Sequence, residues 1–178
     1  MSRIVCIVGC LIAVLVPSAV GQHKQRPAKP PRNMFIDLSV ERARHTRDVG
    51  AYSDRKSQHV ALTITLNNRN TNQDYQDLTG YSYVVAQDVL DKRRFKLIIK
   101  ESETFNLPRG QKIQHETEEV RLEFAEDDSW RHGFKYYGYV YLVEDKQGKV
   151  LAGAASVDKL WDKLGKLADL NPDEEFTF

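Results

Sequence analysis

Five histidines are the first residues to consider as metal ligands or catalytic bases: His23, His45, His59, His115 and His132. No two of them stand at a spacing typical of metal ligands, and the chain contains no HExxH, GxSxG or phosphate-loop motif. His59 stands at the start of an alternating segment, and His132 lies near Trp130. We interpret both as surface or strand-end residues, because neither has a partner motif. The histidines therefore predict no metal, no cofactor and no catalytic site.

The acidic residues around 120–124 are the second group that could do chemistry. Glu116, Glu118 and Glu119 precede this segment, and three acids at 126–128 follow it. A glycoside hydrolase needs two carboxyl groups about 5–10 Å apart across a cleft, which such a cluster could supply. Acids beside a strand are also the usual solvated face and turn of an antiparallel sheet. We favour the second interpretation, and a glycan hydrolase stays the third alternative for function.

Tyrosines in the run 136–143 give the most suggestive binding signal. Tyr137, Tyr139 and Tyr141 alternate, so they should share one face of a strand. If that face is solvated, the three rings form a flat row suited to stacking on sugar rings or gripping a protein. If a helix covers the face, the row is core, and this is the interpretation we favour. Trp161, on the predicted helix, completes the candidate binding residues.

Strands must position these residues, because apolar residues alternate with polar ones along most of the chain. Seven segments alternate in this way: 34–40, 60–66, 81–85, 95–99, 120–124, 134–143 and 150–155. Turn residues separate them, with Gly110 and Gly148 at positions that need a positive φ. The pattern predicts an all-β fold, a single antiparallel β-sandwich of about seven strands. The apolar residues expected in its core are Ile36, Leu38, Val40, Val60, Leu62, Ile64, Leu66, Leu97, Ile99, Leu122, Phe124, Val140 and Leu142.

A helix should follow the last strand. Apolar residues recur at three- and four-residue spacing from Val157 to Leu170, Ser156 can cap the first turn, and Pro172 follows the end. We therefore expect one amphipathic C-terminal helix, which packs on the sandwich or meets a partner. The expected division is a sandwich over 34–155 and a helix with its tail over 156–178.

The segment around the last hairpin resembles immunoglobulin-like and fibronectin-III-like sandwiches. The acids at 127–128, then Phe134, Tyr136 and Tyr137, lead into an alternating strand and a hairpin closed by glycine. The resemblance implies that Tyr137 or Tyr139 hydrogen-bonds back across the corner that precedes its strand. The cysteine pair of the family is missing, so the resemblance is one of architecture, which hosts many functions.

The first 21 residues have the pattern of a signal peptide. Arg3 precedes an apolar run over 4–16, and the small residues Ala19 and Gly21 precede Gln22. Both cysteines lie inside this segment, so cleavage after Gly21 leaves a chain without thiols. A lipidated start at Cys10 is the weaker alternative, because the apolar run continues past it.

Residues 22–33 follow as a basic, proline-rich spacer with four cations and no acid. Their charge density is too low for a nucleic-acid arm, and no later stretch is apolar enough to cross a membrane as a helix. The absence of an Asn-x-Ser/Thr sequon fits a bacterial protein. We expect an exported, periplasmic or extracellular module without catalytic activity that acts through a protein or cell-surface partner. A carbohydrate-binding module is the alternative; the oligomeric state stays open.

Overall fold

The computed structural model describes residues 35–48, 55–127 and 130–178, although not the side chains of 43–48, 127 and 130. The described residues form nine strands and two short helices. They are β1 (Ile36–Asp48), β2 (Arg55–Asn68), β3 (Tyr75–Asp88), β4 (Arg94–Leu107), β5 (Lys112–Glu116), β6 (Val120–Asp127), β7 (Trp130–Glu144), β8 (Val150–Ala155), α1 (Asp158–Asp162), α2 (Leu164–Asp169) and β9 (Glu175–Thr177).

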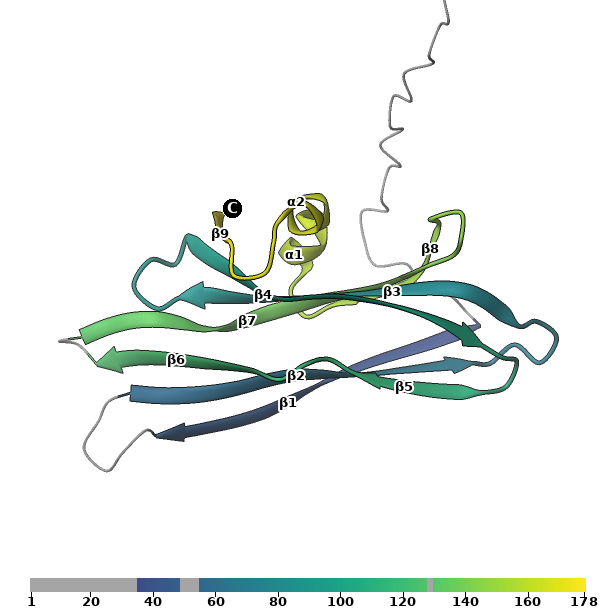
Figure 1. Ribbon diagram of the computed structural model, residues 1–178, viewed down its shortest axis with the longest axis horizontal. Helices are drawn as coiled ribbons and strands as arrows, with labels where there is room; N and C mark the ends of the chain where they lie inside the picture. Colours follow the sequence, from purple (N-terminus) through teal and green to yellow (C-terminus); the bar gives the residue numbers. More distant parts are fainter. Residues whose placement is uncertain (1–34, 49–54, 128–129) are drawn as a thin grey trace, which may run out of the picture.

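All strand pairs are antiparallel, which confirms the predicted all-β fold. The strand order is β1-β2-β6-β7-β3-β4-β9, with β5 paired to β2 and β8 paired to β7. Figure 1 shows β1, β2, β5 and β6 in one layer and β3, β4, β7 and β8 in the other. The layers are continuous because residues 130–133 of β7 pair with β6, whereas residues 134–144 pair with β3.

The space between the two layers holds the inner core. Its buried side chains include Leu62 and Ile64 of β2, Val84 of β3 and Tyr141 of β7. Most of the residues expected inside the sandwich from their alternation are buried here, although Leu38 and Val40 on β1 are only partly buried.

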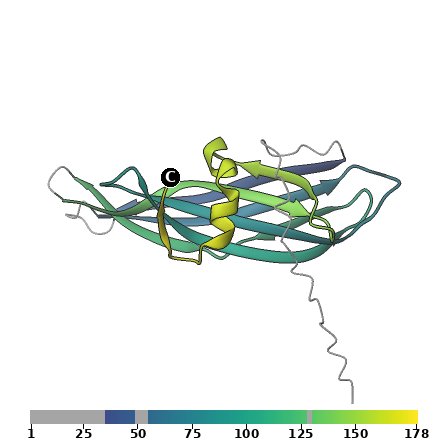
Figure 2. The same cartoon turned by 90° about the horizontal axis from the view of Figure 1, so that it is seen from above.

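A second core lies on the other face of the β3–β4–β7 layer, under α1 and α2. Leu97, Val140 and Leu142, expected in the single sandwich core, belong to this outer core. Figures 1 and 2 show the two helices lying across the strands on that outer face. Both faces of this layer are therefore buried, so strict alternation of apolar and polar residues fails in it.

The predicted single helix is wrong in detail, because the chain forms two short helices. Lys163 separates them with φ −99° and ψ 8°. Gly165 follows this break, and glycine costs about 1 kcal/mol relative to alanine within a helix, so helix propensity is weak here. The Ser156 hydroxyl does not cap α1; it accepts a hydrogen bond from the Tyr139 backbone N–H at 2.8 Å.

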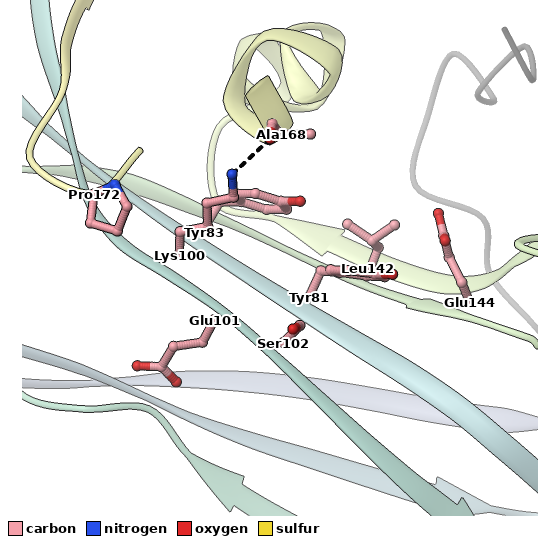
Figure 3. A pocket seen from close by; sticks show the side chains of 9 residues that line it. All are labelled: Tyr81, Tyr83, Lys100, Glu101, Ser102, Leu142, Glu144, Ala168 and Pro172. Carbon is pink, nitrogen blue, oxygen red and sulfur yellow. Dashed lines mark hydrogen bonds between the residues drawn. The ribbon is translucent and has the colours of Figure 1, made fainter. Parts of the chain in front are cut away.

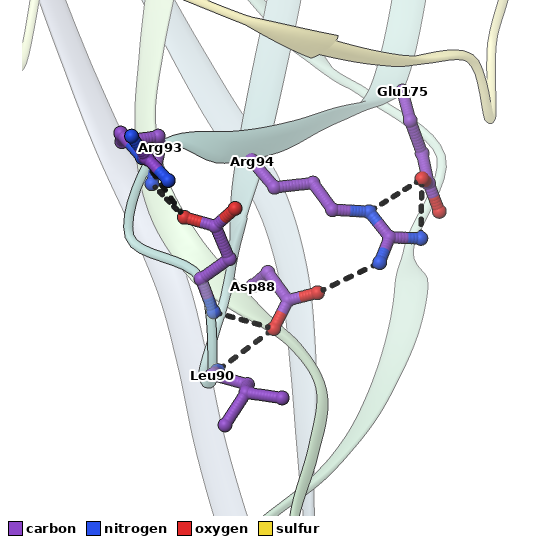
Figure 4. A network of polar contacts seen from close by, with 6 residues as sticks. Asp88, Leu90, Arg93, Arg94 and Glu175 are labelled. Atoms are coloured by element: carbon purple, nitrogen blue, oxygen red, sulfur yellow. Dashed lines mark hydrogen bonds and ion pairs between the residues drawn. The ribbon is translucent and has the colours of Figure 1, made fainter.

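Two strands, β5 and β9, escaped the sequence analysis because each is short. In β9, Phe176 packs against Phe95, with ring centroids 5.8 Å apart. The Arg94 guanidinium joins β4 to this strand, since it bonds to Glu175 at 2.5–2.6 Å and to Asp88 at 3.4 Å (Figure 4). The other Asp88 oxygen accepts hydrogen bonds from the backbone N–H groups of Leu90 and Asp91, which fixes the β3–β4 turn.

The predicted glycine turns are confirmed. Gly110 has φ +65° and Gly148 has φ +70°. The Asp145 carboxylate accepts from two backbone N–H groups of the β7–β8 turn, which is the expected hairpin. The predicted signal peptide and spacer at 1–33 lie outside the described residues. Within the described ranges, no helix is long and apolar enough to cross a membrane.

Candidate binding groove beside helix α2

The three candidate tyrosines of β7 do not form one exposed row. Tyr141 is fully buried in the inner core, and Tyr139 is half-buried on the same side, where its hydroxyl donates to the Val40 carbonyl at 3.4 Å. Tyr137 packs against the outer core, with its ring 5.0 Å from that of Phe95. Burial raises the pKa of Tyr139 and, more strongly, that of Tyr141.

A β-bulge explains why the shared-face prediction is wrong. Val85 pairs with Gly138 and Ala86 pairs with Tyr136, so Tyr137 is an extra residue on β7. An extra residue shifts the alternation by one, so Tyr137 and Tyr139 belong to opposite faces. The helices cover the face of Val140 and Leu142, and the other layer covers Tyr141.

Trp161, the fourth candidate, is a core residue of α1 with 4% of its surface exposed. Its ring lies over Gly153 of β8, where an added Cβ would lie 2.8 Å from Cζ3. The corner implied by the immunoglobulin-like resemblance also differs here. The Tyr139 hydroxyl reaches β1 in the opposite layer, about a hundred residues away in the sequence, instead of a residue a few positions upstream.

The histidines are placed separately. His23 and the side chain of His45 lie outside the described residues, and His132 is exposed on β7. His59 Nδ1 lies 2.8 Å from the Glu119 carboxylate. In the described part of the chain, no group of three or more His, Cys, Asp or Glu side chains could hold a metal ion.

The candidate carboxylates near 120–124 are dispersed among different partners. Glu119 bonds to His59, while Glu116 and Glu118 are exposed. Glu126 accepts a hydrogen bond from Lys135 Nζ at 2.6 Å, and this bond is the main reason that its pKa is lowered. The Asp127 side chain and residue 128 lie outside the described part.

A different acidic group does form a cluster, at the edge where β4 faces β5. His115 Nδ1 lies 2.8 Å from Glu103, and its Nε2 lies 3.9 Å from Glu101. Glu101 also accepts a hydrogen bond from the Glu118 backbone N–H. These bonds link two strands that share no backbone pairing, so the cluster closes one edge of the sandwich.

A groove of about 450 Å³ lies on the outer face of the β3–β4–β7 layer, beside α2. We call it the α2 groove (Figure 3). Its lining residues come from three strands, α2 and the loop that follows: Tyr81, Tyr83, Lys100, Glu101, Ser102, Leu142, Glu144, Ala168 and Pro172.

Strand register accounts for the composition of the floor. Tyr81 lies opposite Ser102 on β4 and Leu142 on β7, and cross-strand partners share a face. Glu144 is two residues after Leu142 on β7, so the two side chains lie on the same face of the strand. Tyr81 and Glu144 are half-buried and Ser102 is exposed, so an aromatic ring, a carboxylate and a hydroxyl border the same hollow.

Lys100 forms the link between the floor and α2. Its ammonium donates to the backbone carbonyls of Ala168 and Leu170, each at 2.7 Å. These are carbonyls at the C-terminal end of α2, which lack partners within the helix. The lysine therefore holds the wall of the groove in place, as the dashed line to Ala168 in Figure 3 illustrates.

A second hollow, of about 310 Å³, contains charged groups that already pair with one another. Lys56 and Lys135 both lie beside Glu126, and the Arg42 guanidinium lies 4.1 Å from the centre of the Tyr136 ring. Its side chains thus have partners, whereas the α2 groove has a half-exposed ring and carboxylate at its mouth.

The sequence places Tyr81 and Tyr83 on a predicted strand, and no motif marks them as binding residues. Their alternation matched that of ordinary core residues, and Tyr83 is indeed buried. Tyr81 is a groove residue because the two helices cross the strands at one place and leave this end of the outer face uncovered. No pattern in the strand itself carries that information.

No family model and no curated protein matches the chain. A crystal structure from Akkermansia muciniphila is 14% identical, covers 74% of this chain and 80% of its own, and has a TM-score of 0.39. A structural genomics target, SoR45, is 12% identical over 68% and 85% of the two chains, with a TM-score of 0.36. A β-glucosidase from Kluyveromyces marxianus, solved with glucose, is 10% identical over 81% of this chain and 15% of its own, with a TM-score of 0.29.

Proposed function

We propose that this protein is an exported β-sandwich module without catalytic activity, which acts by binding a protein or cell-surface partner in the α2 groove. The observation that carries the proposal is the lining of the groove. The Tyr81 ring, the Ser102 hydroxyl and the Glu144 carboxylate are all accessible on one face. Binding sites combine apolar contact area with a few placed polar groups in this way.

Preorganisation also supports binding in the groove. The floor consists of three paired strands, and Lys100 bonds the wall to the floor. A site on a rigid scaffold loses little conformational entropy when a ligand binds. The half-exposed Tyr81 offers contact area at a low entropic cost, because a tyrosine has few rotatable bonds.

A carbohydrate partner is the second candidate. An aromatic ring beside a hydroxyl and a carboxylate can stack on a sugar and hydrogen-bond to its hydroxyl groups. Tyr81, Ser102 and Glu144 supply these groups in the groove, in place of the β7 tyrosines of the sequence hypothesis. A cell-surface partner, as proposed above, can be a carbohydrate of this kind.

Binding can be mapped by nuclear magnetic resonance on the isotopically labelled protein. The panel comprises chitin, cellulose and peptidoglycan oligosaccharides together with short acidic, neutral and basic peptides. We expect at least one class to shift the backbone amides around Tyr81, Leu142 and Ala168. Tyr81→Ala should abolish the shifts, whereas Tyr136→Ala, a matched change in the second hollow, should preserve them.

Two results would contradict the proposal. Ligand shifts that map to another surface, with the groove amides unchanged, would remove the groove as the contact site. Release of reducing sugar from any of the oligosaccharides would contradict the absence of catalysis. Amide dispersion of each variant establishes that it is folded.

A further inference from the structure

We propose that the α2 groove receives the cationic side chain of a lysine or arginine from a protein partner. This inference rests on the proposed function, since it names the ligand chemistry of the same groove. Three charged residues line the groove: Lys100, Glu101 and Glu144.

Two of these charges are already engaged within the protein. The Lys100 ammonium donates to two carbonyls at the end of α2. The Glu101 carboxylate points away from α2 in Figure 3, toward the other layer, where it accepts from Glu118 N–H and faces His115. Within the described part of the chain, no hydrogen bond or ion pair engages the Glu144 carboxylate. Of the three charged groups that line the groove, the one left to bond to a ligand is therefore a carboxylate.

The aromatic ring stands beside this carboxylate. Tyr81 lies opposite Leu142, two residues before Glu144 on β7. Diagonal neighbours on adjacent strands have their Cα atoms about 7 Å apart. A cation that enters between them can bond to the carboxylate and lie against the electron-rich face of the ring. Both residues line the same hollow.

The remaining lining suits the hydrocarbon part of a long basic side chain. Leu142 lies in the floor, and Ala168 and Pro172 lie in the wall. Lysine and arginine bury their methylene groups along apolar surface while the charged end bonds to a polar group. A volume of about 450 Å³ accommodates one such side chain together with the adjoining backbone of its peptide.

The test compares peptides that differ in one side chain. Acetylated, amidated pentapeptides carry lysine, arginine, norleucine or glutamate at the centre of a Gly/Ser sequence, and amide shifts give the dissociation constants. We expect the lysine and arginine peptides to bind about tenfold more tightly than the norleucine peptide, which corresponds to about 1.4 kcal/mol. Added salt should weaken their binding, because a charge pair contributes.

Variants of the protein identify the groups responsible. Glu144→Gln should remove the preference for lysine over norleucine, whereas Glu41→Gln, an exposed carboxylate on β1, should leave it intact. Tyr81→Leu keeps apolar bulk in the groove but removes the ring face. It should raise the dissociation constant of the lysine peptide about fivefold, because the cation–π contact is lost. Amide dispersion monitors folding in each case.

The outcomes separate the inference from the proposed function. Equal affinity for lysine and norleucine peptides, or an unchanged preference in Glu144→Gln, would overturn the cationic ligand. Binding of neutral oligosaccharides in the groove, with no response to basic peptides, would overturn the inference and leave the binding module standing. No response at the groove to any ligand class would overturn both.

Discussion

The hydroxyl group of Tyr141 occupies the space above Gly80 that a side chain at position 80 would need. Tyr141 reaches this position from β7 across β3, and Glu103, the cross-strand partner of Gly80 on β4, stands beside it. Among the described residues, neither the Tyr141 hydroxyl nor Oε1 of Glu103 has a hydrogen-bond partner. The inner core therefore contains a polar group whose place depends on the absence of a Cβ.

Gly80→Ala should destabilise the protein for this reason. The added Cβ would meet the Tyr141 hydroxyl and would lie 3.1 Å from Cζ of that ring and 3.2 Å from Phe105. Tyr141 is fully buried, so its ring can move aside only if neighbouring core side chains also move. Overpacking of a core typically costs about 1–3 kcal/mol, and urea unfolding at equilibrium measures it.

Gly165→Ala in α2 is the matched control. A Cβ at this position meets no atom within 4 Å, and its φ is not positive. Alanine is the better helix former by about 1 kcal/mol, so this variant should be more stable than the wild type. Gly80→Ala with a midpoint as high as that of the wild type would show that Tyr141 can move aside.

Tyr141→Phe should leave stability unchanged or raise it by about 1 kcal/mol. In the unfolded chain this hydroxyl forms hydrogen bonds with water, and burial without a partner removes them, which destabilises the folded state. Phenylalanine lacks the hydroxyl but keeps the ring in the core. Chemical denaturation of the single variant measures this. The double variant Gly80→Ala, Tyr141→Phe should also recover part of the loss caused by the alanine. A loss of more than 1 kcal/mol in Tyr141→Phe would mean that the hydroxyl has a partner in solution.

The all-β fold and the position of seven strands could be predicted because period-two patterns and turn residues are local signals in the sequence. In β2, the alternation of Val60, Leu62, Ile64 and Leu66 is local information, and all four are buried. The predicted turns followed from similarly local chemistry, since glycine at 110 and 148 permits a positive φ.

The candidate site could not be predicted in the same way. The bulge at Tyr137 inverts the expected face of a tyrosine, yet no residue pattern in the sequence of β7 marks the bulge. The outer core likewise depends on where the helices lie, which is a long-range packing outcome. Glu144 and Tyr81 are 63 residues apart and meet only through the pairing of β3 with β7. Strand pattern alone does not contain that pairing.

The mature protein should begin at Gln22. The charged start, the apolar run and the small residues before position 22 have the pattern of a cleaved signal peptide. The protein is recovered from the compartment outside the cytoplasm of its host. Its intact mass and N-terminal sequencing then identify the first residue of the mature chain. A Gly21→Leu variant should be cleaved poorly, since leucine is too large for the recognition position. A lipid-modified start at Cys10 would contradict this prediction.

Glu103→Gln should change how stability depends on pH. Burial raises the pKa of Glu103, His115 partly offsets the rise, and Glu101 adds to it. A raised pKa in the folded state means that folding favours the protonated carboxyl. The stability that Glu103 contributes is therefore fully present below about pH 4.3, the ordinary value for glutamate, and is lost as the pH rises through the raised folded pKa.

The difference in free energy of unfolding between Glu103→Gln and the wild type should accordingly be more favourable to the variant at pH 7 than at pH 4. Urea unfolding of both proteins at the two pH values measures this difference. Glu126→Gln is the control of opposite sign, because the Lys135 hydrogen bond lowers the pKa of Glu126. A lowered pKa contributes stability above the ordinary value that is lost as the pH falls, so this variant should be less stable than the wild type at pH 7 and approach it at acidic pH. If Glu103→Gln instead followed the trend of Glu126→Gln, the His115 contact would outweigh the burial of Glu103, and the cluster at the β4–β5 edge would stabilise the ionised carboxylate.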